Sequence, residues 1–224
     1  MKRLGLYNAE KRFPEKDAEQ ELLQRFIQTR CINRKERRVI MPMIDLLNHA
    51  PSAKPYDMSG DGIAVSGLYD GEILVKYSVS DPIRRLLGYG FNAAEPLGFS
   101  LFLRLQHRDK KVTVKGGGGR EPMKPCGIEL KDDVVVLNQP LLSASMRPKM
   151  PRTLFIQACR NIEGIDANEL FDQLHQRNTQ SLVQLMRVLD SVEGDVAQRL
   201  RTGCLDQLEA LSNHIGQRDD ILNN

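Results

Sequence analysis

Three polar residues whose side chains could do chemistry lie close together in the sequence: Asp45, Asn48 and His49. An aspartate and a histidine four positions apart could both bind a metal ion, but two ligands are too few to make a site. The other histidines of the chain are His107, His175 and His214, which belong to distant segments. No serine stands in a Gly-x-Ser-x-Gly turn, so a serine hydrolase is not supported. Residue types and spacing alone therefore predict no metal site and favour a turn-forming role for Asn48 and His49.

A run of four glycines, 116–119, and two basic runs, 34–38 and 108–111, could bind phosphate or nucleic acid. No Lys-Ser or Lys-Thr follows the glycines, so they do not make a phosphate-binding loop, and we expect a hairpin tip or surface loop. The net charge of +3 permits an acidic partner without requiring one. We expect a solvated turn at 34–38. Both basic runs suggest a module that binds RNA or ribosomes, which is the weakest of three functional alternatives.

The composition, 41% hydrophobic and 27% charged, is typical of a globular protein. No apolar run approaches the roughly 20 residues that span a bilayer, and the N-terminus lacks the apolar segment of a secretory signal. The four cysteines are widely spaced and include no Cys-x-x-Cys pair, so a zinc cluster is not expected. Scattered cysteines suit a reducing compartment, and we predict a cytoplasmic protein that does not enter a membrane.

The first third of the chain has to position Asp45, Asn48 and His49. Helical spacing of apolar residues predicts a helix over 15–32. Pro42 interrupts a short apolar run, which therefore ends a strand or enters a tight helical turn. Residues 50–62 are rich in proline and glycine and predict a loop. Asp70-Gly71 then predicts a hairpin between a short strand at 63–65 and a strand at 72–79, with Ile73, Val75, Tyr77 and Val79 on one face.

Asp81-Pro82 predicts the start of a helix that Gly88 and Gly90 end. Further strands are predicted at 99–105, 112–114 and 128–137. From about residue 140 the pattern changes to amphipathic helices. The first is predicted at 151–163. The second starts at a capping box made by Asp166 and Glu169 and runs to about residue 190, and the third starts at Asp195. The last of these has an apolar stripe made by Val196, Leu200, Cys204, Leu208, Leu211 and Ile215. These patterns predict an α+β protein with a helical C-terminal part.

The segment from Pro42 to His49 resembles the Pro-x-x-Asp-x-x-Asn-His motif of SET-domain methyltransferases, in particular the subgroup typified by the Rubisco large-subunit lysine methyltransferase. Thr29-Arg30-Cys31-Ile32 is similar to the Ser-Arg-x-Phe of that subgroup. Tyr77 stands where the family has its catalytic tyrosine, and Leu87–Phe91 resembles the subgroup's Tyr-Gly-Phe ending. These motifs follow one another in the family's order over about residues 25–95.

The resemblance implies the C-terminal half of a SET β-fold, with its pseudoknot, over residues 1–110, including the end of the helical insertion. Residues 111–224 would form a mainly α-helical substrate-binding domain with a short β/loop connector. The resemblance also implies S-adenosylmethionine as the cofactor and a protein lysine as the acceptor. A different acceptor stays open, because related SET proteins modify histidine.

Each predicted site residue takes its role from the resemblance. Tyr77 would be catalytic. The cofactor would be bound by Arg30, Asn48, His49 and Phe91, and the substrate by Asp45, Tyr56 and Tyr89, with Tyr89 and Phe91 lining a narrow lysine channel. Free lysine has a pKa near 10.4, and an aromatic channel beside a cationic cofactor would lower that pKa and favour the neutral amine. In-line methyl transfer then depends on positioning, which can contribute about 7–11 kcal/mol, and needs no metal.

The chain departs from the family pattern at three places. Ser78 follows the tyrosine where glycine is frequent, and Ser80-Asp81 replaces Ser-Asn. The N-terminal SET strand with its Gly-x-Gly is not recognisable, so we expect a fragment that starts inside the SET insertion, or else a reduced relative. The main alternative to an enzyme is therefore a non-catalytic SET-like module that binds a protein partner through its helical domain.

Overall fold

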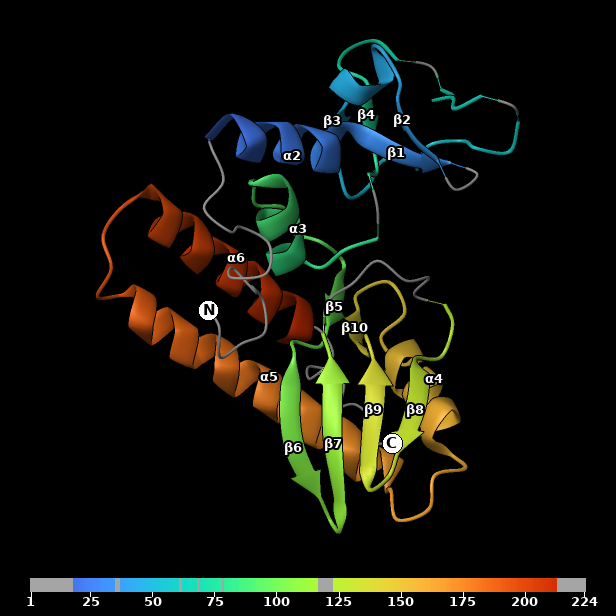
Figure 1. The fold of residues 1–224 in the computed structure, drawn as a ribbon, viewed down its shortest axis with the longest axis vertical. Coiled ribbons are helices and arrows are strands. Elements are labelled where there is room, and N and C mark those ends of the chain that lie inside the picture. Colours follow the sequence, from blue (N-terminus) through green and yellow to red (C-terminus); the bar gives the residue numbers. More distant parts are fainter. Residues whose placement is uncertain are drawn as a thin grey trace. The chain divides into compact units, whose positions relative to one another are not determined.

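The computed structural model describes residues 18–34, 37–60, 62–67, 69–77, 79–116 and 123–212. These residues fall into two compact units, one ending at Tyr77 and the other starting at Val79 (Figure 1). Helices and strands occur together in the chain, which confirms the predicted α+β class at a coarse level. Within the described ranges, no helix combines the length and apolar character that spanning a membrane requires.

The first unit begins with helix α2, Ala18–Arg30, which confirms the predicted helix as far as Arg30. The last two residues of the predicted helix, Cys31 and Ile32, belong to a strand instead. Strands β1, Cys31–Arg34, and β2, Arg37–Ile40, follow as an antiparallel pair in which Arg34 faces Arg37. The basic run at 34–38 was expected to be a solvated turn, but Arg34 belongs to β1, and Arg37 and Arg38 belong to β2. Residues 35 and 36 themselves lie outside the described ranges.

The apolar run around Pro42 ends a strand and leads into a turn, as predicted. β2 ends at Ile40, and a 3-10 helix, η2, spans Ile44–Leu46. Strand β3, Asn48–His49, follows directly.

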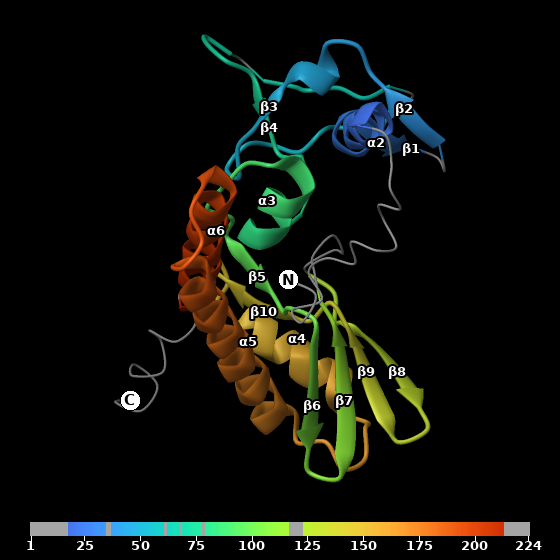
Figure 2. The same ribbon diagram turned by 60° about the vertical axis from the view of Figure 1, so that its left-hand side comes forward.

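The hairpin predicted at Asp70-Gly71 is wrong. Strand β4 is only Leu74–Val75, and it pairs in parallel with β3, so its partner lies upstream of the predicted hairpin (Figures 1 and 2). Of the segment predicted as a strand at 63–65, Ala64 alone forms a bridge, and its partner is Asp57. The predicted alternation also fails, because Val75 is fully buried while Ile73 is 37% exposed.

The second unit begins with helix α3, Pro82–Tyr89, which Asp81 caps as predicted by accepting a hydrogen bond from the Arg84 amide at 2.8 Å. Gly90, in the left-handed conformation at φ 81°, ends the helix, whereas Gly88 lies inside it.

Four strands form one sheet in the order β6-β7-β9-β8. They are β6, Leu103–His107, β7, Lys110–Lys115, β9, Val134–Asn138, and β8, Gly127–Lys131. The predicted single strand at 128–137 is therefore two strands, which turn at Asp132 with φ 52°. The predicted domain division at residue 110 falls where β6 and β7 meet as paired strands of this sheet.

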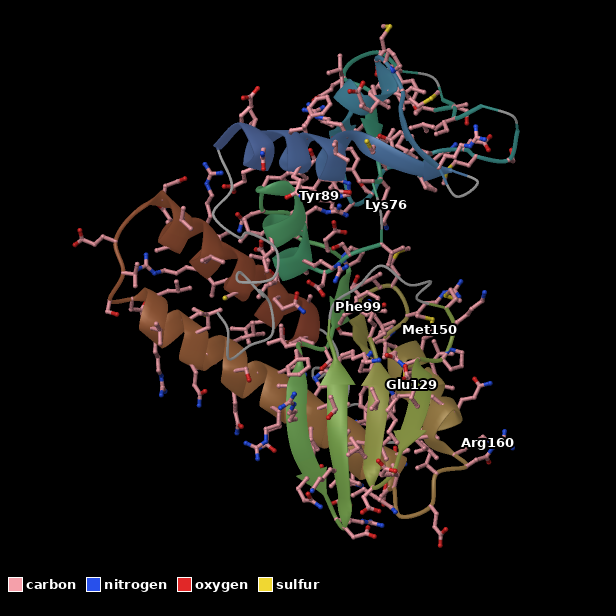
Figure 3. All side chains as sticks on the ribbon, viewed as in Figure 1. Lys76, Tyr89, Phe99, Glu129, Met150 and Arg160 are labelled. Atoms are coloured by element: carbon pink, nitrogen blue, oxygen red, sulfur yellow. The ribbon has the colours of Figure 1, made fainter. Side chains whose placement is uncertain are left out.

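Helices α4, Met150–Cys159, and α5, Ala167–Leu189, cover one face of this sheet (Figures 1 and 2). Alternate residues of β7 and β9 bury their side chains against these helices, and they share one core with Phe155, Leu170, Phe171 and Leu174. Strands β5, Leu97–Phe99, and β10, Leu141–Ala144, form a separate antiparallel pair. Phe99 belongs to a smaller apolar cluster against which Met150 packs (Figure 3).

The capping box predicted at the start of α5 is half correct. The Asp166 carboxylate accepts hydrogen bonds from the Asn168 and Glu169 amides, both at 3.1 Å. The Asp166 amide, which Glu169 would bind in a capping box, donates instead to Nε2 of the buried His107 at 3.2 Å. The tip of β6 is thereby joined to the first turn of α5.

The last described helix, α6, spans Asp195–Ser212. Its predicted apolar stripe is buried from Leu200 onward, including Cys204 and Leu211, and Leu208 packs against the same core. Val196 is 71% exposed and does not belong to the stripe. Ile215 lies outside the described residues.

Gly116 is the one member of the four-glycine run that the structure describes; the expectation for 117–119 falls outside the described residues. A Cβ atom at this position would lie 2.3 Å from the Phe102 backbone nitrogen and 2.7 Å from the Ser100 carbonyl oxygen. Backbone atoms cannot move aside as a flexible side chain can. Glycine is therefore required where the end of β7 passes the chain that leads into β6.

We predict that Gly116→Ala lowers the free energy of unfolding by about 1–3 kcal/mol, the usual cost of overpacking. Gly127→Ala is the matched control, because a Cβ there would meet only the Asn138 side chain, at 3.5 Å. Urea denaturation of both variants measures the difference. Equal stabilities would show that the chain does not approach Gly116 this closely.

Candidate functional site

The parallel pairing of β3 with β4 builds the candidate site. Asn48 pairs with Leu74 and His49 with Val75. The Ala50 amide then donates to the Val75 carbonyl at 3.1 Å, and the Lys76 amide donates to the Lys54 carbonyl at 3.0 Å. This register carries Tyr77, two residues beyond β4, to the side of His49.

His49 and Tyr77 are in direct contact. The Tyr77 amide donates a hydrogen bond to His49 Nδ1 at 3.2 Å, and the two ring centroids are 5.2 Å apart with the planes tilted by 49°. Because Nδ1 accepts this bond, a neutral His49 ring carries its proton on Nε2. The Tyr77 hydroxyl donates to the carbonyl oxygen of Leu47, the residue before β3. Backbone and ring of Tyr77 are therefore both fixed against the Leu47–His49 segment.

Asn48 is exposed, and its Nδ2 donates to Glu72 Oε1 at 2.5 Å. Successive side chains of a strand point to opposite faces, so Asn48 and His49 present different chemistry on the two sides of β3. Glu72 was not predicted as a site residue, because its position in the sequence is that of an ordinary exposed strand residue.

Arg30 and Tyr56 hold the turn that precedes β3. The Arg30 guanidinium donates to the carbonyl oxygen of Asp45, and the Tyr56 hydroxyl donates to the carbonyl oxygen of Ile44 at 3.4 Å. The Asp45 amide donates to the Met41 carbonyl at 3.0 Å. Both side chains thus bind the backbone of η2 and fix how the chain enters β3.

Met43, at the start of this turn, has an uncommon conformation. Its φ of 72° and ψ of −41° lie where a bulky side chain is strained, at a cost of about 1–3 kcal/mol. Its side chain is also 78% exposed. Neither property could be predicted from the sequence, because nothing in Pro42-Met43 signals a positive φ.

Tyr89 and Phe91 lie in the second unit, whereas the six other predicted site residues lie in the first. Their ring centroids are 6.1 Å apart, and the guanidinium carbon of Arg85 lies 5.0 Å from the centroid of the Tyr89 ring. Arg85 is fully buried and bonds through Nε to Glu95 Oε1 at 2.7 Å. Tyr89, on the last turn of α3 (Figure 3), is therefore packed against a buried ion pair.

Asp81, which caps α3, is buried near this ion pair. Burial, with a smaller contribution from the Glu95 carboxylate, raises the pKa of Asp81 from 3.8 to about 6. The hydrogen bond from the Arg84 amide and the charges of Arg84 and Arg85 partly oppose this shift. A proton therefore binds this helix cap more tightly in the folded protein than in the unfolded chain.

We predict that the free energy of unfolding contains a contribution from Asp81 that rises as the pH falls from about 7 to about 4. The sign follows because the folded state, with a pKa of about 6, takes up the proton before the unfolded state, with 3.8. Asp81→Asn keeps an oxygen to cap α3 but does not titrate, so the variant lacks this contribution. Urea denaturation at pH 4.5 and 7.5 measures it, and an identical change in both proteins would contradict it.

Among the described residues, no cluster of three or more histidine, cysteine, aspartate or glutamate side chains could hold a metal ion. Comparisons with protein-family models, curated proteins and solved structures find no match for the chain. The motif residues Leu47, His49 and Tyr77 are in contact with one another and form the centre of the candidate site.

Proposed function

We propose that the chain is a protein-lysine N-methyltransferase of the SET class with S-adenosylmethionine as methyl donor. The observation that carries this proposal is the register of β3 and β4. Residues 28 positions apart in the sequence, His49 and Tyr77, meet through a hydrogen bond and a ring contact. The motif resemblance requires these two residues in one site. The Asp70-Gly71 hairpin predicted from local sequence would instead have paired the strand that leads to Tyr77 with residues 63–65.

The residues present fit a sulfonium cofactor. A cation is stabilised by the face of an aromatic ring, and a polarised methyl group by weak C–H···O contacts to oxygen atoms. The Tyr77 ring, its hydroxyl and the Leu47 carbonyl provide these groups in one place. His49, which contacts Tyr77, would hold the donor, which supplies an electrophilic methyl group when it is bound. The cofactor roles of Asn48 and Arg30 stay predictions, because Asn48 lies on the other side of β3 and bonds Glu72, while Arg30 bonds the Asp45 carbonyl.

The protein's own part in the reaction is to hold groups in place. The Leu47 carbonyl fixes the direction of the Tyr77 hydroxyl, and the His49 ring fixes the Tyr77 backbone. A lysine has to arrive as a neutral amine, and removing it from water favours that form. Asp45 and Tyr56 would act on the substrate through the η2 turn. The lysine-channel role of Tyr89 and Phe91 stays a prediction.

We predict that Tyr77→Phe lowers kcat for methyl transfer about 100-fold, equivalent to about 2.7 kcal/mol, with little change in cofactor affinity. The cause is loss of the hydroxyl that orients the methyl group. Tyr69→Phe is the matched control, since its hydroxyl donates to the nearby Ser66 carbonyl at 3.3 Å and Tyr69 is not a predicted site residue. Transfer of labelled methyl to a lysine peptide library measures kcat, and calorimetry with S-adenosylmethionine measures affinity.

The assay has two outcomes that would contradict the proposal. One is a wild-type chain that neither binds S-adenosylmethionine nor methylates any lysine peptide. The other is a Tyr77→Phe variant that is as active as Tyr69→Phe. The lost Tyr77 hydrogen bond costs only about 0.5–1.5 kcal/mol of stability, so a folded variant is available for the comparison.

A further inference from the structure

The four-stranded sheet of the second unit has an open face that carries an excess of cations. Alternate side chains of its strands join the core against α4 and α5, and the others point to the opposite side, which we call the outer face (Figure 1). The register places Arg104 beside Thr113, and Lys111 and Lys131 on either side of Val134. The cations of the outer face are all exposed: Arg104, Lys111, Lys115 and Lys131.

Glu129 is the one carboxylate that the strands of this sheet place on the outer face. It bonds Lys115 Nζ at 3.1 Å and Lys131 Nζ at 3.2 Å. Hydrogen bonds from Asn138, Lys115 and Lys131 lower the pKa of Glu129 to about 2, so this carboxyl is ionised at neutral pH. One carboxylate against four cations leaves the outer face with a net charge of +3. A partner that complements this face therefore carries negative charge.

The aspartates nearest in the chain lie in turns beyond the ends of the strands. Asp109 is in the turn from β6 to β7, and Asp132 and Asp133 are in the turn from β8 to β9. Both turns lie at the same end of the sheet, because β7 and β9 are parallel and begin there. The end of the sheet to which Lys115 belongs is therefore the more strongly cationic.

The groups between the cations favour nucleic acid over an acidic protein. Gln106, Thr113 and Asn138 supply amide and hydroxyl groups, which in proteins bind phosphates, sugars and bases. The guanidinium carbon of Arg104 lies 5.5 Å from the centroid of the Phe102 ring, and both planes can stack on unpaired bases. Protein interfaces, in contrast, are depleted in lysine, the commonest cation of the outer face.

The width of the sheet favours a single strand over a duplex. Three spacings of about 4.8 Å between neighbouring strands give the outer face a width of about 14 Å. The major groove of B-DNA is about 12 Å wide and admits a helix or a two-stranded ribbon, so the four-stranded face does not enter it. An unpaired strand can instead lie across the face, with its phosphates on the lysines and its bases close to Phe102.

We propose that the outer face binds single-stranded nucleic acid, chiefly through the phosphates. This binding goes beyond the proposed methyl transfer, because no residue of the outer face belongs to the candidate site. Lys111 is a member of the basic run at 108–111. Arg108, from the same run, bonds Asp166 and Glu169 at the start of α5 instead.

Charge reversal at matched positions tests the proposal. Fluorescence anisotropy of labelled oligothymidylate and oligouridylate gives their dissociation constants at about 50 and about 200 mM salt. One variant combines Arg104→Glu with Lys111→Glu. The matched control combines Arg177→Glu with Arg187→Glu, which change the net charge equally at exposed positions of α5. A third variant, Glu129→Gln, removes the carboxylate that competes with the ligand for two lysines.

Four phosphate contacts predict a slope of about −3 in log affinity against log salt, so that affinity falls about 50-fold between the two salt concentrations. The Arg104→Glu and Lys111→Glu variant should bind about tenfold or more weakly, with a slope of about −1, because two contacts are lost. The control should bind nearly as tightly as the wild type, and Glu129→Gln should bind about threefold more tightly.

Equal losses of affinity in the two double variants would overturn the proposal, because net charge alone would then explain the binding. Tighter binding of polyglutamate than of the oligonucleotides would assign the outer face to an acidic protein, and tighter binding of a DNA duplex would remove the preference for single strands. Circular dichroism establishes that the variants are folded. If charge reversal prevents folding, Lys111→Gln replaces it, with a slope shallower by about 0.7 expected and an unchanged slope as the contrary result.

Discussion

The pairing of two short parallel strands is the constraint on which the candidate site depends. β3 and β4 contribute two residues each, and the ladder is extended by the bonds from Ala50 to Val75 and from Lys76 to Lys54. A slip of one residue would turn every side chain of β4 to the opposite face. Val75 would then leave the core and Tyr77 would lose His49, so full burial of Val75 keeps the register.

The turn before β3 and the ladder support each other. Arg30, from the end of α2, binds the carbonyl of Asp45, and the Tyr77 hydroxyl, from beyond β4, binds the carbonyl of Leu47. These two contacts hold the backbone on both sides of Leu46. The strain at Met43 persists because the hydrogen bonds around it outweigh the cost.

Local signals in the sequence predicted much of the structure. Helical spacing and the caps at Asp81 and Asp166 located helices, and Pro42 marked the end of β2. The pairing of β4 could not be predicted in this way. Asp70-Gly71 is a strong local hairpin signal, whereas the observed partner lies more than twenty residues upstream, and alternation within a strand does not specify its partner. The φ of Met43 is held by hydrogen bonds within the turn and by the contact from Arg30 to Asp45, and no residue type signalled it.

Photochemical cross-linking of methyl-tritiated S-adenosylmethionine tests the central claim most directly, because it reports where the donor binds without requiring turnover. After irradiation of the full chain, proteolytic peptides are separated and the label is located. We expect label in peptides that contain Leu47–His49 or the Tyr77 segment, and we expect that label to be lost when excess unlabelled donor competes. Label confined to peptides from the second unit, or label that does not respond to competition, would contradict it.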